Sequence, residues 1–368
     1  MNSALIVQNK GGGHGELGFQ LAKNLQANYK ETVTSITILQ DDSCNDSKEP
    51  FKSYDELGDV KIIKAPLGDE DMTAESLQSL FGEGVRFDYI WDNASKKPEG
   101  SGKAICDCAK GWDPKLYTYV SSAGMYQPTA DQVYPMDEET TPIKEASGQA
   151  LFDKYAGEEL GLPFVSIRPQ YIYGPKANKY SYIDWYFDRL CRDLPLPIPG
   201  DGSQKVSLTN SEDVASILAS VLNDPDAAVS QRFFNCGSDK LHSYEEVAFL
   251  CAEAAGIAKD DVKIDHYDAD LYGKAYFPFR MTDFYVAPDK VKEKLGWKGS
   301  ATSLKDDLSW YYEGYKSRGM GDGPMELMKD WEIVVGSKST WSNGSVYDKY
   351  DPLILDDSEV KPLKIELD

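Results

Sequence analysis

The chain has 368 residues, of which 41% are hydrophobic, so it is long enough to bury a large core. Its formal net charge of −22 argues against electrostatic binding of nucleic acid over a broad surface, because binding to phosphates needs a basic patch. Its apolar runs stay below the roughly 18 residues that span a bilayer, so we expect no membrane span. The six cysteines are scattered, which is typical of free thiols in a reducing compartment.

A glycine-rich turn follows the first predicted strand, which runs from Ala4 to Asn9, and an apolar helix follows the turn. Glycines three residues apart permit a tight turn, a close approach of the backbone to a pyrophosphate, and close packing of the helix. Free N–H groups at the start of the helix also attract phosphates. The glycine-rich turn therefore predicts a dinucleotide site formed by Gly12, Gly13, His14, Gly15 and Gly18. A plain strand-to-helix turn is the alternative.

The second predicted strand, residues 35–40, is followed by an acidic residue, Asp41. An acid at this point of a dinucleotide site can hold the adenine ribose 2′-hydroxyl, and its charge repels a 2′-phosphate. Asp41 therefore favours NAD over NADP as the cofactor. A solvated acidic turn is the alternative, because Asp42 and Asp46 lie close by in the sequence.

Two further predicted strands, residues 60–64 and 87–92, lead to the remaining expected cofactor contacts. Asp69 follows the third strand, and Asn93 and Ala94 follow the fourth. Strands that alternate with helical segments predict a parallel sheet with helices on both faces. The predicted fold class is therefore α/β, a doubly wound Rossmann sheet with a smaller C-terminal lobe.

The fifth predicted strand ends in Ser-Ser-Ala-Gly-Met-Tyr at residues 121–126, which resembles the signature of the extended short-chain dehydrogenases. In active members of that family, the serine at the place of Ser122 hydrogen-bonds the substrate oxygen that is oxidised, beside the cofactor. A tyrosine then transfers the proton, and a lysine four residues later on the same helix face lowers the tyrosine pKa. The same resemblance implies that Asp69 meets the adenine.

The tyrosine and lysine of that pair are replaced in this chain. Asp153 matches the acid that trails the lysine by four residues, which puts Gln149 at the lysine position and Glu145 at the tyrosine position. Gln149 carries no charge, and Glu145 is ionised unless it is strongly buried. We therefore expect no ordinary hydride transfer, and Ser122 and Tyr126 are the weak catalytic candidates that remain.

Other side chains could supply parts of a site. Three lysines are candidates to reach the empty lysine position, namely Lys96, Lys97 and Lys144. Four arginines could meet phosphates, although buried arginines often pair with acids; they are Arg168, Arg189, Arg192 and Arg280. Five aromatic residues could stack on bases, although such residues more often pack a lobe; they are Tyr171, Tyr173, Tyr180, Tyr182 and Trp185. No residues are assigned to a metal.

The dehydrogenase pattern continues in the second half of the chain, where Arg168-Pro169 precedes Tyr173-Gly174-Pro175, and the resemblance covers roughly residues 4–318. The expected organisation is a Rossmann domain (1–175, to which 205–240 return), a smaller lobe (176–318) and a C-terminal extension (319–368). Short apolar groups in the extension indicate docking on the body or on another subunit, and a disordered acidic tail is the alternative.

A narrower resemblance rests on residues 148–155, on residues 185–193, and on Phe277-Pro-Phe-Arg280 with the aromatic pair that follows. These segments resemble the family of the chloroplast stem-loop-binding protein of 41 kDa, which also lacks the tyrosine and lysine pair. The resemblance implies a place in the plastid stroma, binding of structured plastid RNA, Mg²⁺-dependent RNA cleavage, and ribosome or transcription assemblies as partners. Because the first predicted strand begins at Ala4, we expect no transit peptide in this numbering. Plant relatives generally lose the middle glycine that Gly15 keeps, which favours NAD binding here.

Three hypotheses follow. The first is a plastid RNA-associated protein on a degenerate epimerase/dehydratase scaffold that binds NAD and binds or cleaves structured RNA, the latter as a metal-dependent endoribonuclease. The second is an NAD-dependent sugar-nucleotide epimerase, dehydratase or reductase with non-standard catalytic residues. The third is a non-catalytic scaffold that assembles into homo- or hetero-oligomers. Family resemblance favours the first.

Overall fold

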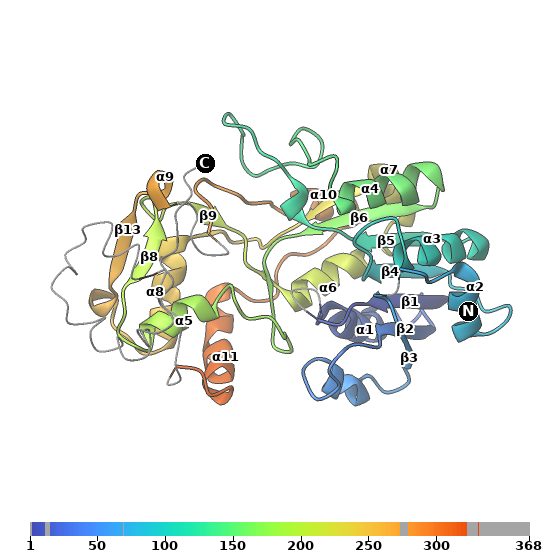
Figure 1. The fold of residues 1–368 in the computed structure, drawn as a ribbon, viewed down its shortest axis with the longest axis horizontal. Coiled ribbons are helices and arrows are strands. Elements are labelled where there is room, and N and C mark those ends of the chain that lie inside the picture. The colour runs from blue at the N-terminus through green and yellow to red at the C-terminus, as the bar shows by residue number, and fades with distance from the viewer. Residues whose placement is uncertain (1, 12–14, 69, 273–278, 322–329, 331–368) are drawn as a thin grey trace, which may run out of the picture. The chain divides into compact units, whose positions relative to one another are not determined.

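The computed structural model describes residues 2–11, 15–68, 70–272, 279–321 and 330, and these form two compact units (Figure 1). The larger unit comprises Met1–Tyr180, Val206–Leu241 and Phe284–Leu304, and the smaller unit comprises Ser181–Lys205, His242–Asp283 and Lys305–Asp368. No helix of the described residues is long and apolar enough to cross a membrane. All six cysteines are free thiols.

The larger unit is built on a seven-stranded parallel sheet, as the sequence predicts. In spatial order its strands are β11 (Phe233–Cys236), β6 (Phe164–Pro169), β5 (Leu116–Val120), β4 (Tyr89–Asn93), β1 (Ser3–Gln8), β2 (Ser35–Asp41) and β3 (Lys61–Ala65). The order reverses between β1 and β4, because the chain moves outward from β1 to β3 and then crosses back to β4. Ligands of such sheets bind at this reversal, beyond the carboxyl ends of the strands.

Both faces of the sheet are buried under helices, and β1 shows why the sequence requires this. Ala4 and Ile6 pack into one apolar cluster and Leu5 and Val7 into a second, so the strand reads as a continuous apolar run. Helices on the first face are α1 (Leu17–Asn28), α6 (Ser211–Ser220) and α10 (Asp289–Leu295). Helices on the second face are α2 (Ala74–Phe81), α3 (Ser101–Trp112) and α4 (Gly148–Lys154).

Shorter elements complete the larger unit. They are η1 (Phe51–Leu57), η2 (Ala123–Met125), η3 (Tyr155–Glu159), α7 (Pro225–Gln231) and the parallel two-residue strands β7 (Ile172–Tyr173) and β10 (Thr209–Asn210). Residues 284–304, which the sequence assigned to the smaller lobe, cluster with the larger unit. The reason is packing, because Phe284 and Val286 join Tyr126 in one apolar cluster and Trp297 joins the core beside α6.

The smaller unit pairs helices with two short sheets. Its elements are α5 (Asp184–Leu190), β8 (Leu196–Pro199), β9 (Lys205–Val206), β12 (His242–Ser243), α8 (Tyr244–Ala254), η4 (Lys259–Asp261), β13 (Ile264–Tyr267), α9 (Ala269–Tyr272) and α11 (Leu304–Ser317). Ser243 caps α8 in a reciprocal capping box with Glu246. Phe187 of α5 stacks on Tyr311 and Tyr312, so aromatic packing holds α11 against α5.

Candidate nucleotide-binding site

The turn between β1 and α1 has the close packing that its glycines predict. The backbone N–H of Gly18 donates to the Gln8 side-chain oxygen at 2.7 Å, and a Cβ on Gly18 would lie 2.3 Å from that oxygen. A Cβ on Gly15 would lie 2.7 Å from the Cα of Gly11. Neither position has room for a side chain, as expected of a turn built to approach a ligand with its backbone. Gly12, Gly13 and His14 lie outside the described residues.

A pocket of about 630 Å³ lies in the larger unit at the carboxyl ends of four neighbouring strands. Asn9 follows β1, Asp41 ends β2, Leu67 follows β3, and Ala94 follows β4, and all four line the pocket. Its wall also includes Gly11, Ser43, Asn45, Phe51, Gly68, Gly100, Ser101, Gly102 and Asn178, together with the acids Glu70 and Glu99 and the lysines Lys10, Lys48, Lys96 and Lys97. The predicted Asp69 lies outside the described residues.

Asp41 has the geometry of a ribose-binding acid. It is 7% exposed, and its Oδ1 atom accepts hydrogen bonds from the backbone N–H and the hydroxyl of Ser43 at 2.9 and 2.6 Å. Within the described part of the chain, Oδ2 accepts no hydrogen bond. One oxygen therefore fixes the carboxylate in place, and the other is left without a donor among the described residues in a side chain that lines the pocket.

Asn93 supports the turn, whereas the sequence predicts it as a cofactor contact. Its Nδ2 donates to the Gln8 side-chain oxygen at 2.9 Å, and its carbonyl oxygen accepts from Asn9 Nδ2 at 2.9 Å. The end of β4 thus holds the beginning of the glycine turn in position. Ala94, the next residue, lines the pocket, and its contact with a cofactor stays a prediction.

Asn178 lines the same pocket and Glu16 precedes α1 beside the glycine turn, and the sequence reasoning missed both. Glu16 is 2% exposed, and its Oε1 atom accepts from Gln20 Nε2 at 2.7 Å and from the backbone N–H of Lys176 at 2.9 Å. Burial raises the pKa of Glu16 to about 7. Asn178 lies so close to Gly11 that a Cβ there would be 2.7 Å from its Nδ2. An acid at the start of an apolar helix could have indicated Glu16, but no local signal indicates Asn178.

Glu145 and Gln149 do not share a helix face. Glu145 is exposed and precedes α4, which begins at Gly148 with Ser147 as its N-cap. The Ser147 hydroxyl accepts from the backbone N–H of Ala150 at 3.2 Å, which fixes this start. A pair of side chains four residues apart meets only when both lie in the helix. Positions 145 and 149 therefore lack the tyrosine and lysine side chains of the family, and they also lack the shared helix that would bring two such side chains together.

The three lysines predicted as replacements are placed differently. Lys144 donates from Nζ to the carbonyl oxygen of Gly124 at 2.9 Å, two residues after Ser122 in the chain. Lys97 pairs with Glu70 at 3.3 Å. Lys96 is exposed and lines the nucleotide pocket.

Ser122 and Tyr126, the two catalytic candidates, differ in burial and in hydrogen bonding. Ser122 is half-buried just beyond β5, and its hydroxyl accepts from the backbone N–H of Gly124 at 3.0 Å. Tyr126 is buried, donates to Asn235 Oδ1 at 2.8 Å and accepts from Arg168 Nη1 at 3.0 Å. Burial raises the pKa of Tyr126 to about 12. These contacts make Tyr126 a structural residue, contrary to its place among the catalytic candidates.

The predicted arginines mostly pair with acids inside the fold. Arg168 Nη2 lies 3.3 Å from Asp153 Oδ2, and the guanidinium lies over the ring of Phe233. Arg189 Nε lies 2.7 Å from Asp330, and Arg192 lies 3.7 Å from Asp188 in the same helix region. Arg280 is half-buried in the smaller unit. The predicted stacking aromatics that are buried pack the interior, namely Tyr171, Tyr173, Tyr182 and Trp185.

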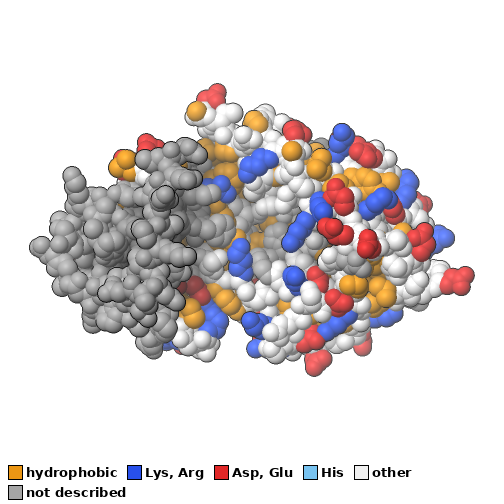
Figure 2. All heavy atoms as spheres, viewed as in Figure 1, with side chains coloured by type: hydrophobic (Ala, Val, Ile, Leu, Met, Phe, Trp, Pro, Cys, Tyr) orange, Lys and Arg blue, Asp and Glu red, His pale blue; other side chains and the backbone are white. Residues whose placement is uncertain are grey.

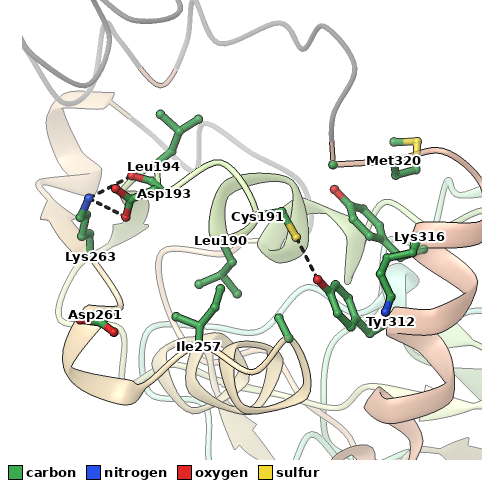
Figure 3. A pocket seen from close by; sticks show the side chains of 13 residues that line it. Leu190, Cys191, Asp193, Leu194, Ile257, Asp261, Lys263, Tyr312, Lys316 and Met320 are labelled. Atoms are coloured by element: carbon green, nitrogen blue, oxygen red, sulfur yellow. Dashed lines mark hydrogen bonds and ion pairs between the residues drawn. The ribbon is translucent and has the colours of Figure 1, made fainter.

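A second pocket, of about 460 Å³, lies within the smaller unit (Figure 3). Leu190 of α5, Ile257 beyond α8 and Tyr312 of α11 line it, and Lys263 pairs with Asp193 at 2.6 Å. None of the predicted site residues lines it. No group of three or more histidine, cysteine, aspartate or glutamate side chains among the described residues could hold a metal ion.

The parallel sheet, its reversal point, the glycine turn and Asp41 together define a Rossmann-fold nucleotide-binding protein. A family model described as "NAD dependent epimerase/dehydratase family" matches residues 11–237, and the chain belongs to this family.

The relatives include a stem-loop binding protein and sugar-nucleotide enzymes. The chain is 31% identical over 244 residues to the chloroplast stem-loop binding protein of 41 kDa b of Arabidopsis thaliana, a match that covers 62% of this chain and 63% of the relative. It is 23% identical over 323 residues to the trifunctional UDP-glucose 4,6-dehydratase/epimerase/reductase RHM2 of the same plant, with 82% and 46% covered. The chain thus spans less than two thirds of the length of either protein. The sequence resemblance to the stem-loop-binding family is confirmed.

Solved structures of sugar-nucleotide enzymes share the fold. The dTDP-glucose 4,6-dehydratase of Bacillus anthracis, in complex with NAD, has a TM-score of 0.63 at 18% identity and covers 86% of this chain and 98% of its own. The UDP-glucose 4-epimerase of Thermus thermophilus, also in complex with NAD, has a TM-score of 0.60 at 18% identity, with 85% and 99% covered. The predicted Rossmann class is confirmed.

The residues of the pocket fit the adenosine half of NAD, the cofactor in the family's name. Asp41 offers one carboxylate oxygen to a ribose, Phe51 and Leu67 give the wall apolar surface, and Gly15 leaves no side chain between the turn and a phosphate. The lining of this pocket does not include Ser122, Glu145 or Gln149. The described pocket therefore fits the adenosine half of the cofactor and does not extend to the positions of the family's catalytic residues.

Proposed function

We propose that this chain is an NAD-binding, RNA-associated plastid protein that has lost the proton-transfer chemistry of its family. The observation that carries the proposal is the position of Glu145, which is exposed and precedes α4, with uncharged Gln149 in the first turn of that helix. NAD would be held by Asp41 and the glycine turn, and when bound it supplies hydride chemistry that the chain itself no longer assists.

Two observations support the RNA role. A relative 31% identical to the chain is named for stem-loop binding and is chloroplastic. Four lysines also line the nucleotide pocket in a protein whose net charge is −22. Lys10, Lys48 and Lys96 form no ion pair with a described acid, whereas Lys97 pairs with Glu70. Figure 2 shows both signs of charge interspersed over one face of the larger unit, so a basic surface here is local.

Location, partners and cleavage belong to the same proposal. The plastid stroma, ribosome or transcription assemblies, and self-association or hetero-association follow from the relative's family. We assign RNA cleavage and Mg²⁺ to no residues, because the described chain offers no cluster of metal-binding side chains. The geometry supports the part of the proposal that concerns binding of NAD and RNA, and it offers no residues for cleavage.

The test is the affinity of the protein for a plastid 3′ stem-loop RNA across a salt titration, with and without Mg²⁺. The variant in which Lys10, Lys48 and Lys96 become alanine should bind more weakly and lower the log–log salt slope by roughly 2 to 3, since each phosphate contact contributes about 0.7 to 0.9. The matched control replaces Lys30, Lys110 and Lys298, three exposed lysines away from the pocket, and should bind like wild type. Absence of RNA binding at low salt would reject the RNA role.

A sugar-nucleotide enzyme is the second candidate, and Ser122 favours it. This serine keeps its family position just beyond β5 and is half-buried rather than sealed in the core. The test is nicotinamide absorbance during incubation with NAD and UDP- or dTDP-glucose. We expect no turnover, and a steady absorbance change that depends on Ser122 would favour this alternative.

A further inference from the structure

The nucleotide pocket is suited to a chemical group that occurs outside dinucleotides. The adenosine half of NAD presents a base, a ribose with free 2′ and 3′ hydroxyls, and a 5′-phosphate. The last nucleotide of an RNA strand with an unmodified 3′ end presents the same three features. An internal nucleotide does not, because its 3′ oxygen is esterified.

Asp41 can distinguish these two kinds of nucleotide. Its Oδ1 atom is fixed by two hydrogen bonds from Ser43, Oδ2 has no donor among the described residues, and the residue lines the pocket. A carboxylate oxygen in this position accepts hydrogen bonds from a free diol and repels a phosphate placed there. The side chain is 7% exposed, so water screens that repulsion poorly.

The lysines provide a path for the rest of the strand. Lys10 immediately precedes the glycine turn, which is the side of a Rossmann pocket where phosphates lie, and Lys96 follows the end of β4. Both are exposed and neither forms an ion pair with a described acid. Phosphates upstream of a terminal nucleotide would therefore leave the pocket past positive charge.

We propose that this pocket binds the single-stranded 3′ end of RNA through its terminal adenosine, in competition with NAD. The inference rests on the proposed RNA association and adds the group that is recognised. The protein would then distinguish RNA ends by their chemistry. Ends with a free 2′,3′-diol enter the pocket, and ends with a 3′-phosphate or a 2′,3′-cyclic phosphate are rejected by Asp41.

The experiment compares three RNAs that share one hairpin, each labelled with fluorescein at the 5′ end. One carries a short single-stranded oligoadenylate tail with a 3′-hydroxyl, one carries the same tail with a 3′-phosphate, and one has no tail. Fluorescence anisotropy with the wild-type protein measures each affinity. We expect the 3′-phosphate to weaken binding about tenfold or more, to the level of the tailless hairpin, and NAD to displace only the tailed 3′-hydroxyl RNA.

Asp41→Asn tests the residue, and Asp42→Asn is the matched control because Asp42 is exposed and does not line the pocket. Asp41→Asn should bind the two tailed RNAs with nearly equal affinity, whereas Asp42→Asn should discriminate like wild type. Circular dichroism and thermal unfolding confirm that each variant is folded. The comparison of the 3′-hydroxyl RNA with the 3′-phosphate RNA uses the wild-type protein and depends on no variant.

The outcomes separate this inference from the proposed function. Equal binding of all three RNAs by wild-type protein, with no effect of NAD, would overturn recognition of the 3′ end and leave stem-loop binding intact. Failure of every RNA to bind at low salt would reject the proposed function and this inference together.

Discussion

At the scale of single residues, Glu16 connects the glycine turn to a loop far away in the sequence. Its Oε1 atom accepts from Gln20 and from the backbone of Lys176, while its Oε2 atom lies beside Gly174 near the Ser211 hydroxyl. Burial is the largest contribution and raises the pKa from an ordinary 4.5 to about 7. The folded state therefore holds a proton more tightly than the unfolded chain does. Stability from this group is present below about pH 4.5 and is lost as the pH rises through about 7.

We predict that Glu16→Gln raises the free energy of unfolding by up to about 3 kcal/mol at pH 8 and by less than about 1 kcal/mol at pH 5. Glutamine keeps the accepting oxygen for Gln20 and Lys176 but carries no charge to be buried. Urea unfolding at the two pH values measures the change. The exposed Glu31→Gln is the control and should have no effect at either pH. An equal effect of Glu16→Gln at both pH values would contradict the prediction.

Tyr126 is the second residue with a testable role. Its hydroxyl stands between Arg168 and Asn235, so removing it leaves two buried polar groups without that partner. We predict that Tyr126→Phe lowers the free energy of unfolding by about 1–3 kcal/mol and leaves NAD binding unchanged. Tyr89→Phe is the control, because that hydroxyl makes no hydrogen bond with a described residue. Chemical unfolding and calorimetric titration with NAD provide the two readings, and a lost NAD affinity in a stable variant would point instead to a role in the site.

At the scale of elements, the start of α4 decides whether the family's chemistry could be restored. The helix begins at Gly148, with Ser147 as its N-cap, so position 145 lies three residues before the helix and position 149 lies in its first turn. A Cβ on Gly148 would lie 2.2 Å from the carbonyl oxygen of Lys96, so the helix start is also packed tightly on the end of the loop after β4. Substitution at 145 and 149 alone does not move this boundary.

We predict that Glu145→Tyr combined with Gln149→Lys raises NAD affinity, because it removes a negative charge and adds a positive one close to the loop after β4, whose Lys96 lines the nucleotide pocket. It should not create sugar-nucleotide turnover, because residue 145 stays outside the helix. Calorimetry measures the affinity, and nicotinamide absorbance with UDP-glucose measures turnover. Clear turnover in the double variant would show that the pocket has kept its substrate and that only the pair is missing.

At the scale of the whole molecule, the sheet was predictable and the final contacts around the site were not. Strands such as residues 3–8 are continuous apolar runs that only a sheet covered on both faces can bury, and the residues after them fall at one edge. Asp41 and Ala94, which that rule predicts as cofactor contacts, both line the pocket. It could not place Asn178 against Gly11, or bring residues 284–304 into the larger unit, because both depend on packing between segments far apart in the sequence.

The charge of the whole molecule leads to two opposite responses to salt. Self-repulsion at a net charge of −22 destabilises the folded state, and ions screen it over about 10 Å at 0.1 M. In the proposed complex, RNA contacts Lys10, Lys48 and Lys96 in the pocket lining, and the same ions would release it. We therefore predict that raising NaCl from about 20 to 300 mM increases the melting temperature while RNA affinity falls steeply. Thermal unfolding and anisotropy on one preparation measure both quantities. The variant in which all three lysines become alanine separates self-repulsion from RNA contacts. It should keep the rise in melting temperature with salt and lose most of the salt dependence of RNA binding. Loss of both responses in this variant would mean that the lysines act through stability alone.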